Sequence, residues 1–187
     1  MNISAVLLAG GESRRMGQDK ATLTFRGRPL WQIQCDLLLK LQPKEIFVSA
    51  RVDPPWRPAG MQFVSDEPPS RGPLSGLAAT LVRISTDHLL ALAIDMPLMT
   101  ESYLLSLCNL IEPVRGVLPM IGNRAEPLAA IYPKDARMDF IAALSGSDFS
   151  LQSLTKKLVE AGKLSLLNVL EEEGEFFQNF NDRSDFG

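Results

Sequence analysis

The residues of this sequence best suited to chemistry form a short segment, rich in glycine and positive charge, close to the amino end. They are Gly10, Gly11, Arg14, Arg15, Gly17 and Lys20. Glycine lets main-chain N–H groups approach a ligand closely, and arginine and lysine add charge-assisted hydrogen bonds. An apolar run over residues 3–8 leads directly into this segment, which is typical of a buried strand that feeds an anion-binding turn. The pattern therefore predicts a loop that binds phosphate.

The spacing of these residues excludes the two most familiar phosphate-binding loops. A P-loop carries Lys-Ser/Thr directly after its second glycine, whereas Lys20 comes late and is followed by Ala21, which has no hydroxyl for a metal. A dinucleotide-binding turn needs glycines that are spaced apart, whereas Gly10 and Gly11 are adjacent. A basic turn that serves only solubility is the alternative interpretation of the same residues.

Two aspartates stand where strands are expected to end. Asp95 follows the unbroken apolar run 89–94, and Asp66 follows a short strand-like stretch at 61–65. In open α/β sheets, ligands bind beyond the carboxyl ends of the strands. The segment Gly72-Pro73-Leu74-Ser75-Gly76 comes soon after Asp66 and opens a helix, so we expect a second loop of the same site there. The alternatives are a helix cap for Asp95 and a turn-forming role for Asp66.

The whole chain alternates between strand and helix patterns, and these elements must position the candidate residues. Expected strands cover 3–8, 45–50, 61–65, 89–94, 116–121, 128–132, 163–167 and 176–180, and expected helices cover 29–40, 72–84, 100–110, 134–144 and 151–161. The strands at 116–121 and 128–132 form a candidate antiparallel pair across Gly122-Asn123-Arg124. This order predicts an α/β fold in three layers with a mostly parallel central sheet.

Composition limits the class of protein further. A chain of 187 residues, 45% hydrophobic and 22% charged, suits one domain over residues 1–187. A formal charge of -3 argues against a nucleic-acid partner. Cys35 and Cys108 lie far apart without metal-binding spacing, which indicates reduced thiols. Because we find no leader pattern and no long apolar span, we expect a soluble cytoplasmic protein that does not contact membranes.

Two conspicuous features have a structural interpretation. His88 is the only histidine and precedes the expected strand 89–94, so a partly buried structural role fits it better than catalysis. Residues 171–175 are rich in glutamate and are expected to form a solvated turn. An acidic cluster of this kind also suits a second metal ion, which is the functional alternative.

Residues 8–20 read L-A-G-G-E-S-R-R-M-G-Q-D-K and closely resemble the L-A-G-G-x-S-x-R-M-G-x-D-K loop of the nucleotidyltransferases. Within that superfamily the chain is most similar to the molybdenum cofactor guanylyltransferases. Asp95-Met96-Pro97 matches their D-x-P element, and Asn179-Phe180-Asn181 matches their closing N-x-N. The resemblance implies a Rossmann-like α/β/α nucleotidyltransferase fold. It also implies transfer of GMP from GTP to the terminal phosphate of molybdenum-bound molybdopterin, with release of pyrophosphate.

The resemblance implies roles for individual residues on the nucleotide side. Lys20, Arg15 and Asp95 would be catalytic, with Lys20 and Arg15 on the phosphates and Asp95 as the ligand of Mg²⁺. Asp66 would accept hydrogen bonds from N1–H and the 2-amino group of guanine, because a carboxylate can accept both. The nucleotide-binding residues would be Leu8, Ala9, Gly10, Gly11, Lys20, Asp66, Gly72, Pro73, Leu74 and Asp95.

The same resemblance assigns the acceptor side to Asn179, Asn181 and Arg124, whose amides and guanidinium suit pterin and phosphate groups. Arg51 departs from the pattern, because several relatives have asparagine there. The expected partners are GTP and molybdopterin, with molybdoenzyme maturation proteins as further candidates. The chain would act as a monomer or weak oligomer.

Three alternatives remain open on the sequence. A molybdopterin cytidylyltransferase and a sugar-phosphate-type nucleotidyltransferase would perform the same chemistry with a different base or acceptor. A nucleotide-binding maturation factor without turnover belongs to a different class. Competition between nucleotides distinguishes the first two from a guanylyltransferase, and pyrophosphate release distinguishes the third.

Overall fold

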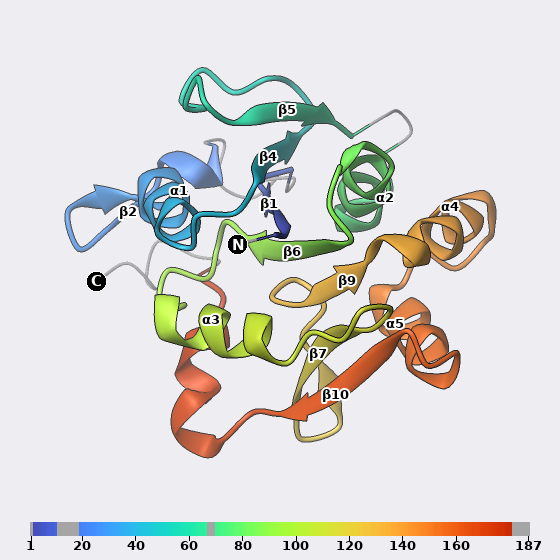
Figure 1. Cartoon of the computed structure of the whole chain (residues 1–187). Helices are drawn as coiled ribbons and strands as arrows, with labels where there is room; N and C mark the ends of the chain where they lie inside the picture. The colour runs from blue at the N-terminus through green and yellow to red at the C-terminus, as the bar shows by residue number, and fades with distance from the viewer. Residues whose placement is uncertain (1, 11–18, 67–69, 181–187) are drawn as a thin grey trace.

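The computed structural model describes residues 2–10, 19–66 and 70–180. Its centre is a sheet in the order β10-β7-β9-β6-β1-β4-β5, with β8 paired to β7 (Figure 1). The strands are β1 (Ser4–Leu8), β4 (Glu45–Ala50), β5 (Gln62–Ser65), β6 (His88–Ala93), β7 (Gly116–Ile121), β8 (Arg124–Ala125), β9 (Ile131–Pro133) and β10 (Leu164–Asn168). β2 (Thr24–Phe25) and β3 (Arg28–Pro29) form a separate antiparallel pair.

Helices cover both faces of this sheet, which confirms the three-layer α/β prediction. They are α1 (Leu30–Lys40), α2 (Pro73–Arg83), α3 (Glu101–Asn109), α4 (Arg137–Ser145) and α5 (Leu151–Glu160), with short 3-10 helices η1 (Lys20–Thr22), η2 (Lys134–Ala136) and η3 (Glu171–Phe177). Figure 1 shows α1 and α3 on one side and α2, α4 and α5 on the other. Each face packs a separate apolar cluster against the sheet.

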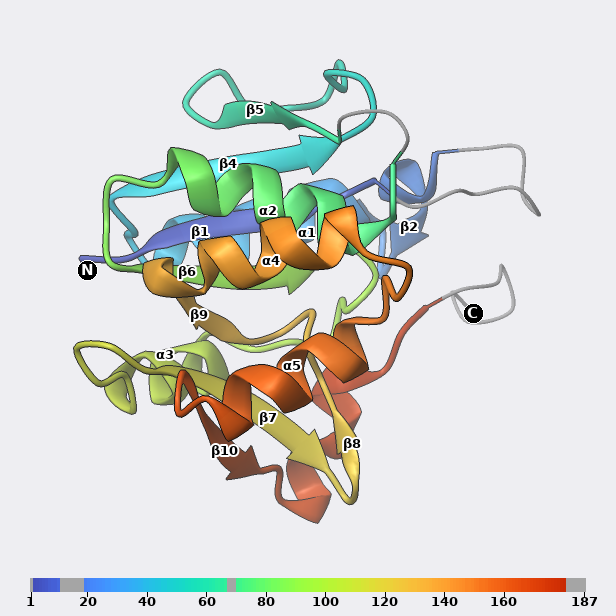
Figure 2. The same ribbon diagram turned by 90° about the vertical axis from the view of Figure 1, so that its right-hand side faces the viewer.

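The central strands have the composition that a covered parallel sheet requires. β1 and β6 are buried at every position and pair in parallel, as their unbroken apolar runs predict. β1 also pairs in parallel with β4, and β4 with β5. Because these strands run the same way, their carboxyl ends meet at one edge, where the arrows of β4 and β6 point in Figure 2.

The antiparallel pairing predicted for the strands at 116–121 and 128–132 is confirmed, because β7 and β9 are antiparallel neighbours in the sheet, but β8 comes between them in the chain. The turn at Gly122 joins β7 to β8, and φ of 57° at this glycine allows the tight reversal. β9 begins only at Ile131 and runs antiparallel to β6, with a single pair, Val117 with Ile131, joining it to β7. A side chain at Gly116 would collide with the carbonyl of Ile131, so this join requires glycine.

The strand expected at 176–180 is wrong. Residues 171–177 form η3 instead, and the rings of Phe176 and Phe177 both contact Tyr103, with centroids 5.7 and 5.2 Å away. A 3-10 turn places two successive rings on one neighbour, whereas an extended strand would direct them to opposite faces. The glutamate-rich segment, expected as a solvated turn, is part of the same helix.

The burial expected for His88 is confirmed. His88 is buried and begins β6, and Cys35 and Cys108 are free thiols on α1 and α3. Burial raises the pKa of Cys35 to about 12 and that of Cys108 to about 11, which keeps both protonated at neutral pH. Among the described residues, every helix is too short or too polar to span a membrane.

Candidate nucleotide site

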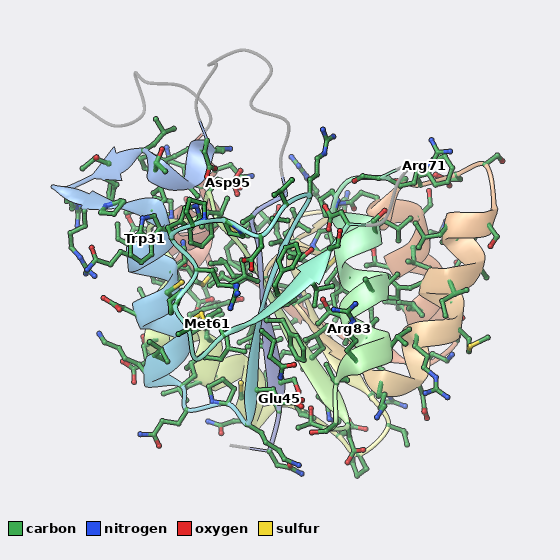
Figure 3. All side chains as sticks on the ribbon, turned by 90° about the horizontal axis from the view of Figure 1, so that it is seen from above. Trp31, Glu45, Met61, Arg71, Arg83 and Asp95 are labelled. Carbon is green, nitrogen blue, oxygen red and sulfur yellow. The ribbon has the colours of Figure 1, made fainter. Side chains whose placement is uncertain are left out.

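A cavity of about 470 Å³ opens at the carboxyl edge of the parallel strands. Residues singled out from the sequence line it from three directions: Leu8, Ala9, Gly10, Lys20, Asp66, Gly72, Pro73 and Asp95. Figure 3 shows Asp95 at this edge of the molecule and Glu45, at the start of β4, at the opposite edge. The structure therefore brings Gly10, Lys20 and both aspartates together.

Main-chain hydrogen bonds fix the two strand ends that carry the glycine loop and Asp95. The N–H of Ala9 donates to the carbonyl of Ser49 at 2.8 Å, and the N–H of Ile94 donates to the carbonyl of Leu8 at 3.1 Å. These bonds extend the pairing of β1 beyond its ends on both sides. Ala9 and Ile94 are thus neighbours, and Asp95 follows at the edge of the same cavity.

Lys20 and Asp95 form the closest pair of opposite charges in this cavity. Lys20 Nζ lies 2.6 Å from Asp95 Oδ2, and the two side chains are 17% and 19% exposed. Lys20 is the first residue of η1, whose N-cap is Asp19. An ammonium group and a carboxylate therefore converge on one point from segments 75 residues apart in the sequence.

Asp66 is buried at the back of the cavity. Ser49 Oγ donates a hydrogen bond of 2.7 Å to Asp66 Oδ1. A side chain at Gly10 would collide with Asp66 Oδ2, and one at Gly76 would collide with Ser49 Oγ. The carboxylate is thus held between Gly10 and Gly76 of α2, where an added side chain would displace Asp66 or Ser49.

The electrostatic state of Asp66 follows from this burial. Removal from water raises its pKa above the usual aspartate value, while the bond from Ser49 and the charge of Arg51 act in the opposite direction. Arg51 follows β4 directly and lines the same cavity. The site thus places a guanidinium at the position where the resemblance to the family suggested asparagine.

The loop before α2 forms the far wall of the cavity. Gly72 has φ of 65°, a conformation that favours glycine, and Pro73 is the first residue of α2. The N–H of Arg71 donates to Ser75 Oγ at 2.8 Å, which ties the loop to the helix. Leu74 differs from the other residues proposed for nucleotide binding, because its side chain is fully buried in the core and does not line the cavity.

Arg124 and Asn179, the described residues expected on the acceptor side, do not line this cavity. Arg124 is exposed in β8, with Nε 3.9 Å from Glu126 Oε1, and burial raises the pKa of Glu126. Asn179 is exposed and precedes Phe180. The N–H of Phe180 donates to the carbonyl of Asp95 at 2.9 Å, so the tail segment reaches the edge of the nucleotide site.

Three of the proposed site residues, Gly11, Arg15 and Asn181, lie outside the described residues. Conversely, the cavity includes residues that sequence reasoning did not select: Ser49, Ser70, Ala93, Ile94 and Leu128, besides Arg51. Ser49 carries a signal that was available, because it is a hydroxyl near the end of an otherwise apolar strand. Leu128 gives no such signal, since only the path of the chain before β9 brings it there.

Gly10 and Lys20 beside a strand-end carboxylate, at the carboxyl edge of a three-layer α/β sheet, are typical of a nucleotide-binding protein of the Rossmann-like class. Residues 5–161 match the family model described as the MobA-like NTP transferase domain. The chain belongs to this family and is therefore a nucleotidyltransferase. The match covers β1 to α5 and thus both walls of the cavity.

Individual relatives agree with this assignment. A probable molybdenum cofactor guanylyltransferase from Opitutus terrae is 31% identical over 98% of this chain and 92% of its own length. A molybdenum cofactor guanylyltransferase from Syntrophotalea carbinolica is 33% identical over 98% of this chain and 88% of its own. The crystal structure of molybdopterin-guanine dinucleotide biosynthesis protein A from Archaeoglobus fulgidus shares the fold, with a TM-score of 0.73 at 23% identity and coverage of 98% and 94%.

Proposed function

We propose that this protein transfers GMP from GTP to the terminal phosphate of molybdenum-bound molybdopterin. An oxygen of the acceptor phosphate attacks the α-phosphorus of GTP, the bond from that phosphorus to the bridging oxygen breaks, and pyrophosphate leaves. The observation that carries the proposal is the convergence of Lys20 and Asp95, 2.6 Å apart, beside Gly10 in one cavity. The names of the relatives support the choice of nucleotide and acceptor.

This chemistry asks the protein mainly to position groups and to neutralise charge. Lys20 would bind the β- and γ-phosphates, the main-chain N–H of Gly10 would donate to a phosphate oxygen, and Arg15 would add a second cation. Asp95 would hold Mg²⁺, which usually takes one or two protein carboxylates and fills its remaining positions with phosphate oxygens and water. The described residues contain no group of three or more metal-binding side chains. A single carboxylate, Asp95, is compatible with the way Mg²⁺ is usually coordinated. When bound, the ion would neutralise charge on the phosphates.

Asp66 would select the base. A carboxylate oxygen can accept more than one hydrogen bond, so the bond from Ser49 leaves Asp66 able to accept from guanine. The loop at Gly72 and Pro73 lies on the wall of the same cavity and offers main-chain groups to the rest of the base. In this proposal Leu74 contributes through its main chain only, since its side chain is in the core.

Replacing Asp66 by asparagine tests its role in base selection while keeping the hydrogen bond from Ser49. The asparagine still accepts from Ser49, but it offers guanine one acceptor oxygen and a mismatched donor, so we expect the preference for GTP over ATP and CTP to fall about tenfold. Competition of the three nucleotides in an equilibrium binding assay measures this. An unchanged preference in a folded variant would remove Asp66 from base selection.

The same variant has a predictable pH dependence of unfolding. The folded pKa of Asp66 is raised, so keeping the carboxylate ionised costs stability above that pKa, and the cost disappears as the pH falls below the unfolded value. Asp66→Asn removes the cost. We expect its melting temperature to equal or exceed that of the wild type near about pH 8, with the difference shrinking toward about pH 4.

The remaining assignments rest on the family resemblance and on the position of the tail. Asn179, Asn181 and Arg124 would contact the acceptor at the same edge of the sheet. The protein would be a single domain over residues 1–187, act in the cytoplasm as a monomer or weak oligomer, and pass its product to molybdoenzymes or their maturation proteins. Its two free thiols are consistent with a reducing compartment.

Incubation of the purified protein with GTP, Mg²⁺ and molybdenum-bound molybdopterin tests the function. We expect release of pyrophosphate with GTP and much less with CTP or ATP. Release with CTP alone would replace the proposal with a cytidylyltransferase. Tight GTP binding without pyrophosphate release would favour a maturation factor that does not turn over.

A further inference from the structure

The connection between β4 and β5 carries a tryptophan that lies beside the Lys20 segment. Trp56 stacks on Trp31 of α1, with ring centroids 5.8 Å apart and planes inclined by 16°. Arg57 follows Trp56 and forms two hydrogen bonds with Asp53, at 2.7 and 2.8 Å, within the same connection. The ring stack and this ion pair give the connection a defined position. Figure 3 shows Trp31 on the same side of the molecule as Asp95.

The indole nitrogen of Trp56 reaches the segment that carries Lys20. Trp56 Nε1 donates to Asp19 Oδ2 at 2.9 Å. The other carboxylate oxygen, Asp19 Oδ1, accepts from the N–H of Ala21 at 3.0 Å and so caps η1. One oxygen of Asp19 thus orients the turn, and the other attaches it to the connection.

We propose that Trp56 is a positioning residue that holds Lys20 in the nucleotide cavity by way of Asp19. η1 has only three residues, and so short a 3-10 turn has little capacity to fix its own direction. The Asp19 carboxylate supplies that direction because it is bonded on both sides. This inference deepens the proposed function and rests on it to the extent that Lys20 binds the triphosphate.

The chain offers a matched pair of variants for the test. Trp56→Phe keeps an aromatic ring for the stack and removes only the N–H donor. Trp31→Phe changes the other ring of the same stack and leaves the hydrogen bond from Trp56 to Asp19 in place. We expect Trp56→Phe to lower kcat/KM for GTP at least about fivefold, the scale of one lost bond to a charged group, and Trp31→Phe to change it less than about twofold. Equal effects of the two variants would show that only the stack matters and would overturn the proposal.

A double-mutant cycle separates positioning from a general structural effect. If Trp56 acts through Lys20, adding Trp56→Phe to Lys20→Ala should reduce kcat/KM no further, whereas independent effects would multiply. Melting temperatures of the single variants establish that both remain folded. A multiplied loss in the double variant would contradict action through Lys20.

A measurement without turnover distinguishes failure of this inference from failure of the proposed function. The chain has two tryptophans, so Trp31→Phe leaves Trp56 as the sole indole emitter. We expect inorganic triphosphate to change the emission of this variant, because it draws Lys20 and its turn toward the anion, and to leave the Trp31→Phe, Lys20→Ala variant unchanged. Triphosphate binding detected by calorimetry without any emission change would overturn the inference. An absence of GTP turnover alongside the emission change would overturn only the proposed function.

Discussion

Replacement of Asp95 by alanine is expected to lower Mg²⁺-dependent pyrophosphate release by about a hundredfold or more, on the scale of several kcal/mol of lost transition-state stabilisation. Asp95 is the carboxylate at the end of β6 that would hold the metal ion, and Lys20 is its partner at 2.6 Å. The variant also leaves the ammonium of Lys20 without this partner, so nucleotide binding should fall less than turnover. Steady-state rates across a range of Mg²⁺ concentrations measure the effect.

Asp87 provides the control for this variant. It precedes β6 at the end opposite to Asp95, and its side chain is exposed. Asp87→Ala removes a carboxylate next to the same strand and is expected to leave turnover within about twofold of the wild type. Normal folding of Asp95→Ala together with unimpaired Mg²⁺-dependent turnover would remove the metal assignment.

Replacement of Lys20 by alanine is expected to lower kcat/KM for GTP by about a hundredfold. Attraction between an ammonium and a phosphate oxygen at a few ångströms is worth several kcal/mol where water is partly excluded, and Lys20 is only 17% exposed. Because the ion pair with Asp95 is partly solvated, the melting temperature should change by only a few degrees. Steady-state kinetics and thermal unfolding measure the two effects.

Two further lysine variants sharpen this prediction. Lys40→Ala removes an exposed ammonium at the end of α1 and should not affect turnover. Lys20→Arg keeps the positive charge on a planar guanidinium, so its kcat/KM should lie between those of Lys20→Ala and the wild type. A loss smaller than about twofold in Lys20→Ala would contradict a role on the phosphates.

The sequence is sufficient to predict the elements that are buried on both faces. The bounds of β4 and β7 are as expected, because a mostly apolar run between Lys44 and Arg51, or between Arg115 and Gly122, leaves little freedom in where a strand begins and ends. The same logic placed Asp66 and Asp95 at strand ends. Parallel pairing then brings those ends together without any information on individual contacts.

Contacts that depend on a particular partner could not be predicted in this way. The bond from Trp56 to Asp19 spans 37 residues and that from Ser49 to Asp66 spans 17, and hydrophobic periodicity reports burial rather than partners. The prediction of a strand at residues 176–180 was wrong for a related reason. A strand was expected there, but Phe176 and Phe177 both pack against Tyr103 from a 3-10 turn, a contact that the sequence does not show.

The contact between Lys20 and Asp95 affects which ions the cavity attracts before a nucleotide binds. Among the described residues that line the cavity, Lys20 and Arg51 carry two positive charges, and Asp66 and Asp95, when ionised, carry two negative ones. A cavity whose charges compensate one another offers a weak field to a stray cation or a lone anion. If Lys20 binds the phosphates and Asp95 binds the metal ion, as proposed, a nucleotide with its ion would replace the Lys20–Asp95 contact by two new contacts. The nucleotide or the ion alone would break that contact and replace only one side of it. In the proposed mechanism, the cavity would therefore favour a nucleotide that carries its metal ion over either component alone.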